Sequence, residues 1–593
     1  MKTKYISQFA LLFTISIVFY SCEPNFLDEH VSSFIEKGNF YQTDADYQSA
    51  LIGVYDMLGS STPLTTDARG LPLFMGNYGY GHMIIGDCGT DLFWLTTTGF
   101  KGYPGAPGSE YALETYNTTT NYASGIGLWA NNYIGIDRAN NLIVKVTDAD
   151  SIKSKRNQYK AEAKFLRALY YYDLVTVLGG VPVVLQPTPA GTYLQPTRAS
   201  VDSVFKVIIN DLVTALPHLV DVPAANGYVS KNAARGLLAR VYLYLASMKQ
   251  LANLPEDAKL GKINSFDFVD AKEYYRLAAE SALQVIATYP SANPFTDATS
   301  STGLTQYASS FYPIEKSPDL IFDIQFSSNF PQLEGSYVYK AFGPVGSSVL
   351  GGGVNYLRPM FNNHYETYDV ADARFTLNIC TYQLVSVNGV TTFKQATTAT
   401  NIKSWMTFGK YRIAINPTNT INNNPQNIPV IRLAEICLIY SEANAEYGVL
   451  NNGTIPSDAY KYLNYVRQRS RTTPTALPDI TQTNLNNSTI VKPLVVGQNI
   501  IPGGVTGDIG NFRIAILNER KWELSGEGFR RIDLLRMGVL QNIVTALNTS
   551  ETETTGASAI LYPRSIQPKD CFKPIPQREI ELSRETLVQN WGF

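Results

Sequence analysis

Residues 519–536 read ERKWELSGEGFRRIDLLR, and this charged stretch decides how the rest of the sequence is interpreted. Four carboxylates lie among four arginines, and the pairs Arg520 with Glu523 and Glu527 with Arg530 are each three residues apart. Side chains at this spacing are neighbours on a helix, so the pattern predicts an ion-pair network that fastens the C-terminal part of the chain to the remainder. A catalytic pair of carboxylates is the alternative, but neighbouring guanidinium groups lower carboxyl pKa values and make poor general acids of them.

Long amphipathic helices are predicted in several parts of the chain. In residues 156–177, for example, Tyr159, Leu166 and Leu174 recur on one helical face. The same periodicity predicts helices over 200–216, 230–246, 271–288, 430–446, 457–469 and 512–524. Paired helices with Ala and Tyr at close-packing positions favour a mainly α fold, a tetratricopeptide-like helical array, although no strict repeat of about 34 residues is visible.

Long segments rich in Gly, Asn, Thr and Tyr separate these helices. Two of them, at about 60–121 and 291–427, are predicted to be loop-rich insertions, because loops this long in a compact domain are usually functional or self-packing. Apolar residues alternate with polar ones in 320–326, which predicts one of a few short strands. The helical scaffold is expected at about 40–290 and 428–545, with a C-terminal segment at 546–593.

The composition excludes several classes of protein. Hydrophobic residues make up 45% of the 593 and charged residues 17%, which is typical of a globular chain. Lys plus Arg is 48 against 50 Asp plus Glu, so the basic surface that nucleic acid requires is not expected. Aromatic residues reach 12%, with 38 Tyr, and tyrosine serves both cores and sugar-binding surfaces.

The N-terminal segment predicts export. Lys2 and Lys4 precede an apolar stretch over 9–20, and Ser21 and Cys22 follow at once. This is the order of a signal peptide, here predicted as residues 1–21, with Cys22 as the site of lipidation. Ordinary secretion is the alternative, and the mature chain, 22–593, is predicted to be a single unit.

The other cysteines carry no recognisable framework. Cys88, Cys380, Cys437 and Cys571 are far apart, without a CxxC pair or a neighbouring histidine, so no zinc site is predicted. Cys437 is interpreted as a small core residue, and a disulfide among the other three is left open.

Several blocks of the sequence resemble the SusD/RagB-like nutrient-binding lipoproteins. The segment 519–536 is similar to their C-terminal signature, and four further blocks follow the family order. These blocks are Phe26-Leu27-Asp28, residues 161–171 running to 179–182, residues 428–435, and residues 574–580 running to 589–593. The resemblance therefore spans the whole chain.

This resemblance implies a location and two partners. Members of the family are lipid-anchored on the outer face of a Gram-negative outer membrane. They cap a TonB-dependent, SusC-like transporter and capture oligosaccharides or, in some members, peptides. It does not name the cargo, because such proteins differ most in their loops.

The segment 77–103 holds the first candidates for a ligand site, because aromatic rings pack on the flat faces of sugars while carboxylates bind their hydroxyls. The candidates are Tyr78, Asp91, Trp94 and Tyr103 from this segment and Tyr337 and Tyr356 from the later insertion. Tyr307, Phe311 and Tyr312 are weaker candidates from the same insertion. A loop that buries its own aromatic side chains is the alternative interpretation.

Signals for catalysis are weak. The sequence has no HExxH, no GxSxG and no phosphate-binding GxxxxGK[ST] motif, and its four histidines share no ligand spacing. We therefore predict a binding protein that is not an enzyme and that uses no cofactor and no metal. A surface glycoside hydrolase is the alternative class, because its two acids need no local motif.

Overall fold

The structure is a computed structural model. It describes residues 40–59, 78, 81–95, 111–147, 153–189, 196–254, 266–291, 293–295, 307, 311, 317–326, 357–369, 371–411, 427–472, 477–551, 564–584 and 586–593. The chain divides into two compact units, Met1–Ser49 and Ala50–Phe593, and the contacts discussed below lie within the second.

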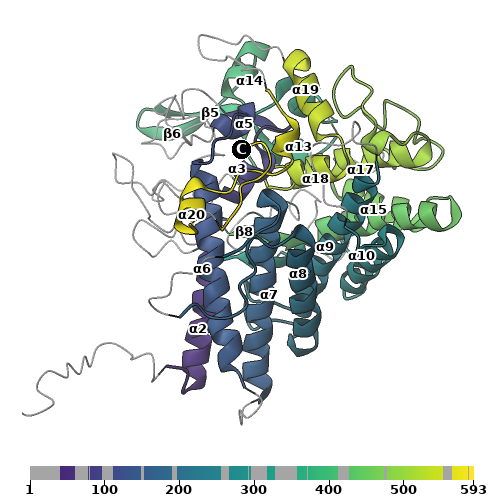
Figure 1. Cartoon of the computed structure of the whole chain (residues 1–593). Helices are drawn as coiled ribbons and strands as arrows, with labels where there is room; N and C mark the ends of the chain where they lie inside the picture. Colours follow the sequence, from purple (N-terminus) through teal and green to yellow (C-terminus); the bar gives the residue numbers. More distant parts are fainter. Residues whose placement is uncertain are drawn as a thin grey trace, which may run out of the picture. The chain divides into compact units, whose positions relative to one another are not determined.

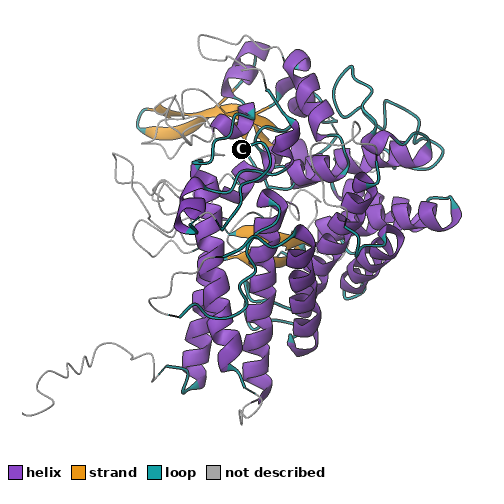
Figure 2. Cartoon of the chain, viewed as in Figure 1, coloured by secondary structure: helices purple, strands orange, loops and turns teal. Residues whose placement is uncertain are grey.

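Helices dominate the described residues (Figure 2). The α-helices are α2 (Asp44–Gly59), α3 (His82–Asp87), α5 (Tyr111–Thr115), α6 (Ala123–Lys145), α7 (Lys153–Leu178), α8 (Val201–Ala215), α9 (Lys231–Ala252), α10 (Ala271–Ile286), α13 (Arg374–Asn378), α14 (Ala399–Trp405), α15 (Leu433–Asn452), α16 (Ser457–Arg469), α17 (Asp508–Leu524), α18 (Arg530–Arg536), α19 (Leu540–Ser550) and α20 (Gln577–Leu582). The predicted mainly α fold is confirmed.

The long helices pack on one another in chain order. Helix α7 lies between α6 and α8, and α10 packs against both α9 and α15, which in turn packs against α16 (Figure 1). The middle of α7 is buried all round, as its apolar side chains require. Side chains of Ser200, Ser230 and Asp270 accept hydrogen bonds from backbone amides in the first turns of α8, α9 and α10, which fixes where each helix begins.

The predicted helices are all found, with α9 and α15 ending about six residues beyond their expected ends. One boundary is corrected, and several helices outside the predicted ranges were missed. Residues 430–432 were expected in a helix but belong to strand β8, because α15 begins only at Leu433. Helices α2 and α6 were not predicted individually. Gly125 and Gly135 bring the backbone of α6 against the rings of Tyr122 and Tyr170, and such glycines weaken a helical pattern in sequence.

The strands are short and pair in antiparallel couples. They are β1 (Phe93–Leu95), β2 (Leu320–Ile324), β3 (Leu357–Pro359), β4 (Ile379–Cys380), β5 (Tyr382–Val387), β6 (Val390–Gln395), β7 (Thr407–Phe408) and β8 (Ile428–Arg432). The couples are β1–β3, β2–β8, β4–β7 and β5–β6. Strand β2 confirms the strand expected in 320–326, and Phe322 on it packs edge-on against Phe165 of α7, with ring centroids 5.3 Å apart.

The four described cysteines, Cys88, Cys380, Cys437 and Cys571, are all buried, and no disulfide joins any two of them. No helix in the described part of the chain has the length and apolar character needed to cross a membrane. The predicted signal segment and Cys22 lie outside the described residues. The predicted domain boundaries stay predictions.

Candidate functional site

The charged segment 519–536 folds into the end of α17, a turn, and α18, and its charged side chains are nearly inaccessible to solvent. Two of its ion pairs are internal: Arg520 Nε lies 2.7 Å from Asp533, and Arg536 lies 2.8 Å from the same carboxylate. Its other pairs reach distant parts of the chain, as Arg536 does with Glu442 of α15. A buried ion-pair network is therefore confirmed, but the spacing indicated the wrong pairs: Arg520 pairs with Asp533 rather than with Glu523, and Arg530 pairs with Asp91 rather than with Glu527.

Glu523 is the centre of this network. Its carboxylate pairs with Arg432 at 2.9 Å and Arg374 at 3.0 Å, and also with Arg469. Burial alone would raise the pKa of Glu523, but Arg469, Arg432 and Arg374 outweigh it and hold that pKa well below its usual range. A carboxylate so strongly ionised is unsuited to donate a proton as a general acid.

The turn between the two helices is held in the same way. Glu527 accepts from Lys410 Nζ at 2.5 Å and from Arg432 Nη2 at 2.7 Å. The backbone amides of Gly528 and Arg530 donate to the buried carboxyl group of Asp87, at 2.9 and 3.0 Å. Gly528 has φ +81° and lies against His82, so both its backbone conformation and the lack of space for a Cβ require glycine.

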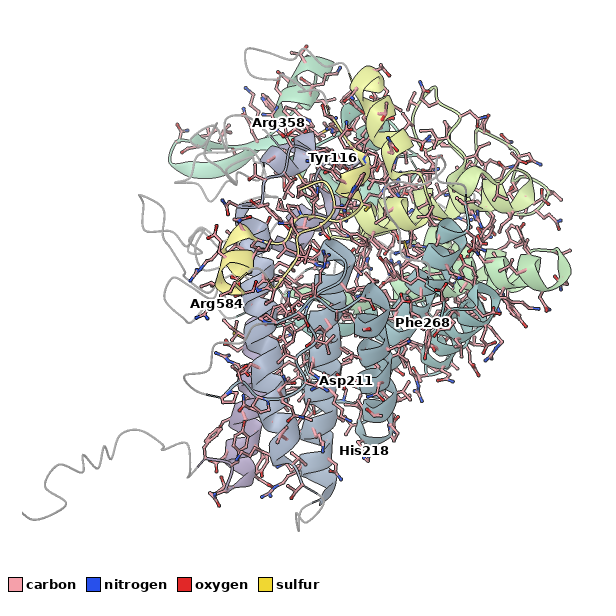
Figure 3. The ribbon with its side chains drawn as sticks, in the orientation of Figure 1. Tyr116, Asp211, His218, Phe268, Arg358 and Arg584 are labelled. Atoms are coloured by element: carbon pink, nitrogen blue, oxygen red, sulfur yellow. The ribbon has the colours of Figure 1, made fainter. Side chains whose placement is uncertain are left out.

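The predicted ligand residue Trp94 lies on β1, opposite Arg358 of β3. Neighbouring strand residues point to opposite faces, so Phe93 is fully buried against Phe408 while Trp94 remains partly exposed. The guanidinium carbon of Arg358 lies 5.9 Å from the centre of the Trp94 ring. An indole and a cation therefore share one surface, and Figure 3 labels Arg358 there.

Further aromatic side chains continue this surface. Arg358 Nη1 donates to the carbonyl of Lys403 on α14 at 3.4 Å, and Lys403 Nζ lies 4.2 Å from the centre of the Phe361 ring. The Phe361 ring stacks on Tyr365 with centroids 5.0 Å apart. We call the set Trp94, Arg358, Phe361, Tyr365 and Lys403 the Trp94 face.

The Trp94 face has a rigid support. Phe361 and Tyr365 pack against a buried cluster that contains Tyr368, Met406 and Trp522, the last of these from the charged segment. Burial lowers the pKa of Arg358, whose Nε is itself buried and has no hydrogen-bond partner in the described part of the chain. The face thus combines partly exposed aromatic rings with a partly exposed guanidinium group, which is chemistry suited to a hydroxyl-bearing ligand.

Two other predicted ligand residues are enclosed by the protein. Asp91 is fully buried and accepts two hydrogen bonds from Arg530, at 2.7 and 2.8 Å. The Tyr78 hydroxyl donates to Asp173 at 3.1 Å, and its ring stacks on His82. Their side chains have internal partners and almost no exposed surface, so the geometry gives no support to the prediction that they bind ligand.

The remaining predictions divide between core and undescribed residues. Tyr307 and Phe311 are buried beside Lys410 and Arg432, with ring centres 4.6 to 5.9 Å from these cations, so these two weaker candidates belong to the core. The following residues lie outside the described part of the chain: Tyr103, Tyr312, Tyr337, Tyr356 and Cys22. Their predicted roles stay predictions.

Sequence reasoning did not find the rest of the Trp94 face. The predicted insertion 291–427 contains the other four residues of the face, Arg358, Phe361, Tyr365 and Lys403. The sequence there does not indicate that β3 pairs with β1. The aromatic content of this insertion was the available signal. Within the described residues, no three side chains of His, Cys, Asp or Glu are grouped as a metal would need, and the predicted absence of metal and cofactor stays a prediction.

Comparison with known proteins identifies the family. Residues 318–593 match the SusD family, and residues 105–243 match a second SusD-like family described as starch-binding and associating with the outer membrane. A SusD-like protein of Formosa agariphila is 24% identical over 95% of this chain and 94% of its own length. A second SusD-like protein of that organism is 24% identical over the full length of both chains.

Solved structures share the fold. A SusD homolog from Bacteroides thetaiotaomicron aligns over 95% of this chain and 100% of its own, with a TM-score of 0.68 and 22% identity. Surface glycan-binding protein A of the same organism, solved in complex with laminarihexaose, covers 92% of this chain and 99% of its own, with a TM-score of 0.60 and 17% identity. The chain belongs to the SusD/RagB-like family, one of whose groups is described as associating with the outer membrane.

Proposed function

We propose that this protein is a cell-surface lipoprotein that binds an oligosaccharide on the Trp94 face and delivers it to a TonB-dependent outer-membrane transporter. The observation that carries the proposal is the partly exposed indole of Trp94, with the Arg358 guanidinium 5.9 Å from its centre. A sugar ring can pack on the indole while its hydroxyls accept from the guanidinium.

Relatives support a glycan rather than another cargo. One structural neighbour is named a laminarin-binding SusD-like protein, and another was solved with laminarihexaose. Neither name identifies the sugar that this chain binds, because members of one fold differ in their sites. A peptide ligand, as expected for some relatives, is the alternative within the same family.

Binding without turnover is part of the proposal. The carboxylates of the charged segment are buried and paired with arginines, so they are unsuited to the acid and base roles of a glycoside hydrolase. Binding to a panel of oligosaccharides that includes laminarihexaose, and to a panel of peptides, should be measured by calorimetry, with mass spectrometry of each mixture after incubation. A bound and unchanged oligosaccharide is expected; shortened products would instead establish the hydrolase, and binding of peptides alone would establish the peptide alternative.

Lipid anchoring and delivery rest on sequence. Anchoring depends on the segment before Cys22, and the transporter is implied by the family resemblance. Purification of the tagged protein from outer membranes in mild detergent should recover a large β-barrel partner in a fixed ratio. Recovery of the protein without such a partner would contradict the delivery role and leave the binding role intact.

A further inference from the structure

A pocket that none of the residues of the Trp94 face line lies in the unit Ala50–Phe593. Its volume is about 310 Å³, and it is bordered by the end of α2, the turn at 226–228 before α9, and the end of β2. Tyr55 and Tyr228 form part of its wall, with ring centroids 5.5 Å apart at 74°. This volume is at the lower end of the range for small-molecule sites.

Asp323 is the polar group that distinguishes this pocket. It lies on β2 in register with Pro429 of β8 and is only 5% exposed. Gln325 Nε2 donates to its carboxylate at 2.6 Å. Within the described residues, Asp323 forms no ion pair, and the groups that stabilise its charge, the Gln325 side chain and backbone amides such as that of Gly227, are neutral.

The surroundings of the pocket are negative. The Tyr55 hydroxyl donates to Glu162 at 2.6 Å, and Glu162 is 1% exposed and likewise has no ion pair among the described residues. Asp56 at the rim pairs with Arg138 at 3.0 Å, which compensates that carboxylate alone. No lysine or arginine lines the pocket in the described part of the chain.

A buried carboxylate without a cation is unfavourable, and a ligand that supplies the cation removes that cost. The faces of tyrosine rings also attract ammonium groups. From this geometry we propose that the pocket binds a small ligand through a primary ammonium group, which lies against Asp323 and beside the pair of rings formed by Tyr55 and Tyr228. An amino sugar and the amino terminus of a peptide both carry that group.

The protonation of Asp323 is consistent with this role. Burial raises the pKa of Asp323 to about 6, and the amide of Gly227 and the side chain of Gln325 lower it only in part. The carboxylate is therefore mostly ionised at neutral pH, when it can receive a cation. The site is independent of the proposed function, because no residue of the Trp94 face lines it.

The test uses matched ligands that differ only in the ammonium group. Glucosamine is compared with glucose, and alanyl-alanine amide with its N-acetylated form, by ligand-observed NMR titration at pH 7.5 of the full mature chain up to about 10 mM. At least one ammonium ligand should bind at least tenfold more tightly than its neutral partner. Whichever pair shows the larger difference identifies an amino sugar or a peptide as the source.

Variants locate the site. Asp323→Asn keeps the size of the side chain and an oxygen that accepts from Gln325, and it should weaken ammonium binding at least tenfold. Tyr228→Leu should weaken it as well. Asp221→Asn, which removes an acid with a 76% exposed side chain from the same connection between α8 and α9, should have no effect. All variants should melt as cooperatively as the parent.

Two results would overturn the proposal. One is equal affinity, or no detectable affinity, for the ammonium ligands and their neutral partners. The other is a preference for ammonium that Asp323→Asn leaves unchanged in a folded protein. Loss of oligosaccharide binding by a variant of Trp94 affects neither result, so failure of this inference and failure of the proposed function are distinguishable.

Discussion

Arg530 donates two hydrogen bonds to the carboxylate of Asp91, 439 positions earlier in the chain, from Nε at 2.7 Å and from Nη2 at 2.8 Å. Both side chains are buried, and Lys521 Nζ lies 3.5 Å from the same carboxylate. The bond joins α18 to the segment that leads into β1, and so to the strand that carries Trp94.

Loss of the Asp91 charge should destabilise the protein strongly. Asp91→Asn leaves two buried cations uncompensated and is expected to lower the free energy of unfolding by about 3 to 5 kcal/mol. Chemical denaturation measures the change. The control Asp458→Asn removes a half-exposed acid paired with Lys461 at 3.9 Å and should leave stability nearly unchanged. Equal stability of the two variants would show that the Asp91 pair contributes little.

Glu527 should matter for stability and not for binding. Glu527→Ala removes the carboxylate that holds Lys410 and Arg432, at a cost of about 3 kcal/mol or more in unfolding free energy. Oligosaccharide affinity of the folded fraction should barely change when it is measured well below the melting temperature. Unaltered melting together with abolished binding or turnover would place the charged segment in an active site.

Trp94 is expected to carry part of the binding energy. Trp94→Ala should weaken oligosaccharide binding about tenfold or more, which corresponds to about 1.4 kcal/mol, because the stacking surface is lost. Calorimetry measures the affinity, and Trp591→Ala, at a 53% exposed tryptophan that does not belong to the Trp94 face, is the control. Unchanged affinity with a melting temperature several degrees lower would make Trp94 a structural residue.

Cys22 should determine membrane attachment. Cys22→Ala removes the thiol that the predicted signal presents for acylation, so the protein should move from the detergent phase to the aqueous phase on fractionation. Cys437→Ala changes a buried cysteine and should leave the partition as in the parent. Equal retention of both variants in the detergent phase would contradict the predicted anchor.

Lys573 should make the free energy of unfolding increase with pH above neutrality. Burial, together with the nearby Arg531, lowers the pKa of Lys573 to about 7, below the 10.5 of an unperturbed lysine. Between these values the unfolded chain binds more protons, so the contribution of Lys573 should favour folding as pH rises, by up to about 1.4 kcal/mol per pH unit.

The measurement for Lys573 is a comparison of two pH profiles. Unfolding free energies of the parent and of Lys573→Met are determined from pH 6 to about 10. The stability of the parent relative to the variant should rise above pH 7 and be constant below it. A difference that does not change with pH would mean that Lys573 keeps an ordinary pKa in the folded protein.

The scaffold was predictable because its signal is local. Burial on one face of a helix imposes a periodicity that each helix shows by itself, as 457–469 did when it matched α16 at both ends. The boundary before α15 was missed because β8 is as apolar as the helix that follows, and apolar runs do not separate the two structures. Helix α6 was missed because glycines, which allow its backbone to pack closely against tyrosine rings, weaken the helical pattern of its sequence.

The site was only partly predictable because it depends on pairing between distant strands. Composition pointed to an aromatic segment around Trp94, but it could not separate Trp94 from Tyr78 and Asp91, which the fold turns inward. The register of β1 with β3 brings in Arg358 from 264 positions later. Likewise, spacing suggested ion pairs within the charged segment, whereas most of its partners lie on other elements.

The pairing of β2 with β8 has a consequence for how the sequence of such a protein can evolve. Ile324 lies opposite Ile428, so the two ends of the segment 325–427 are attached to the helical array at adjacent positions of one antiparallel pair. An inserted segment with fixed, adjacent ends can be lengthened, shortened or exchanged at small entropic cost, because the entropy lost on closing a loop grows only slowly with the length of the loop. Transplanting residues 325–427 from a relative with a different ligand, with Arg374 and Lys410 retained because they pair with Glu523 and Glu527, should therefore give a chimera that folds on this array and takes its selectivity from the donor.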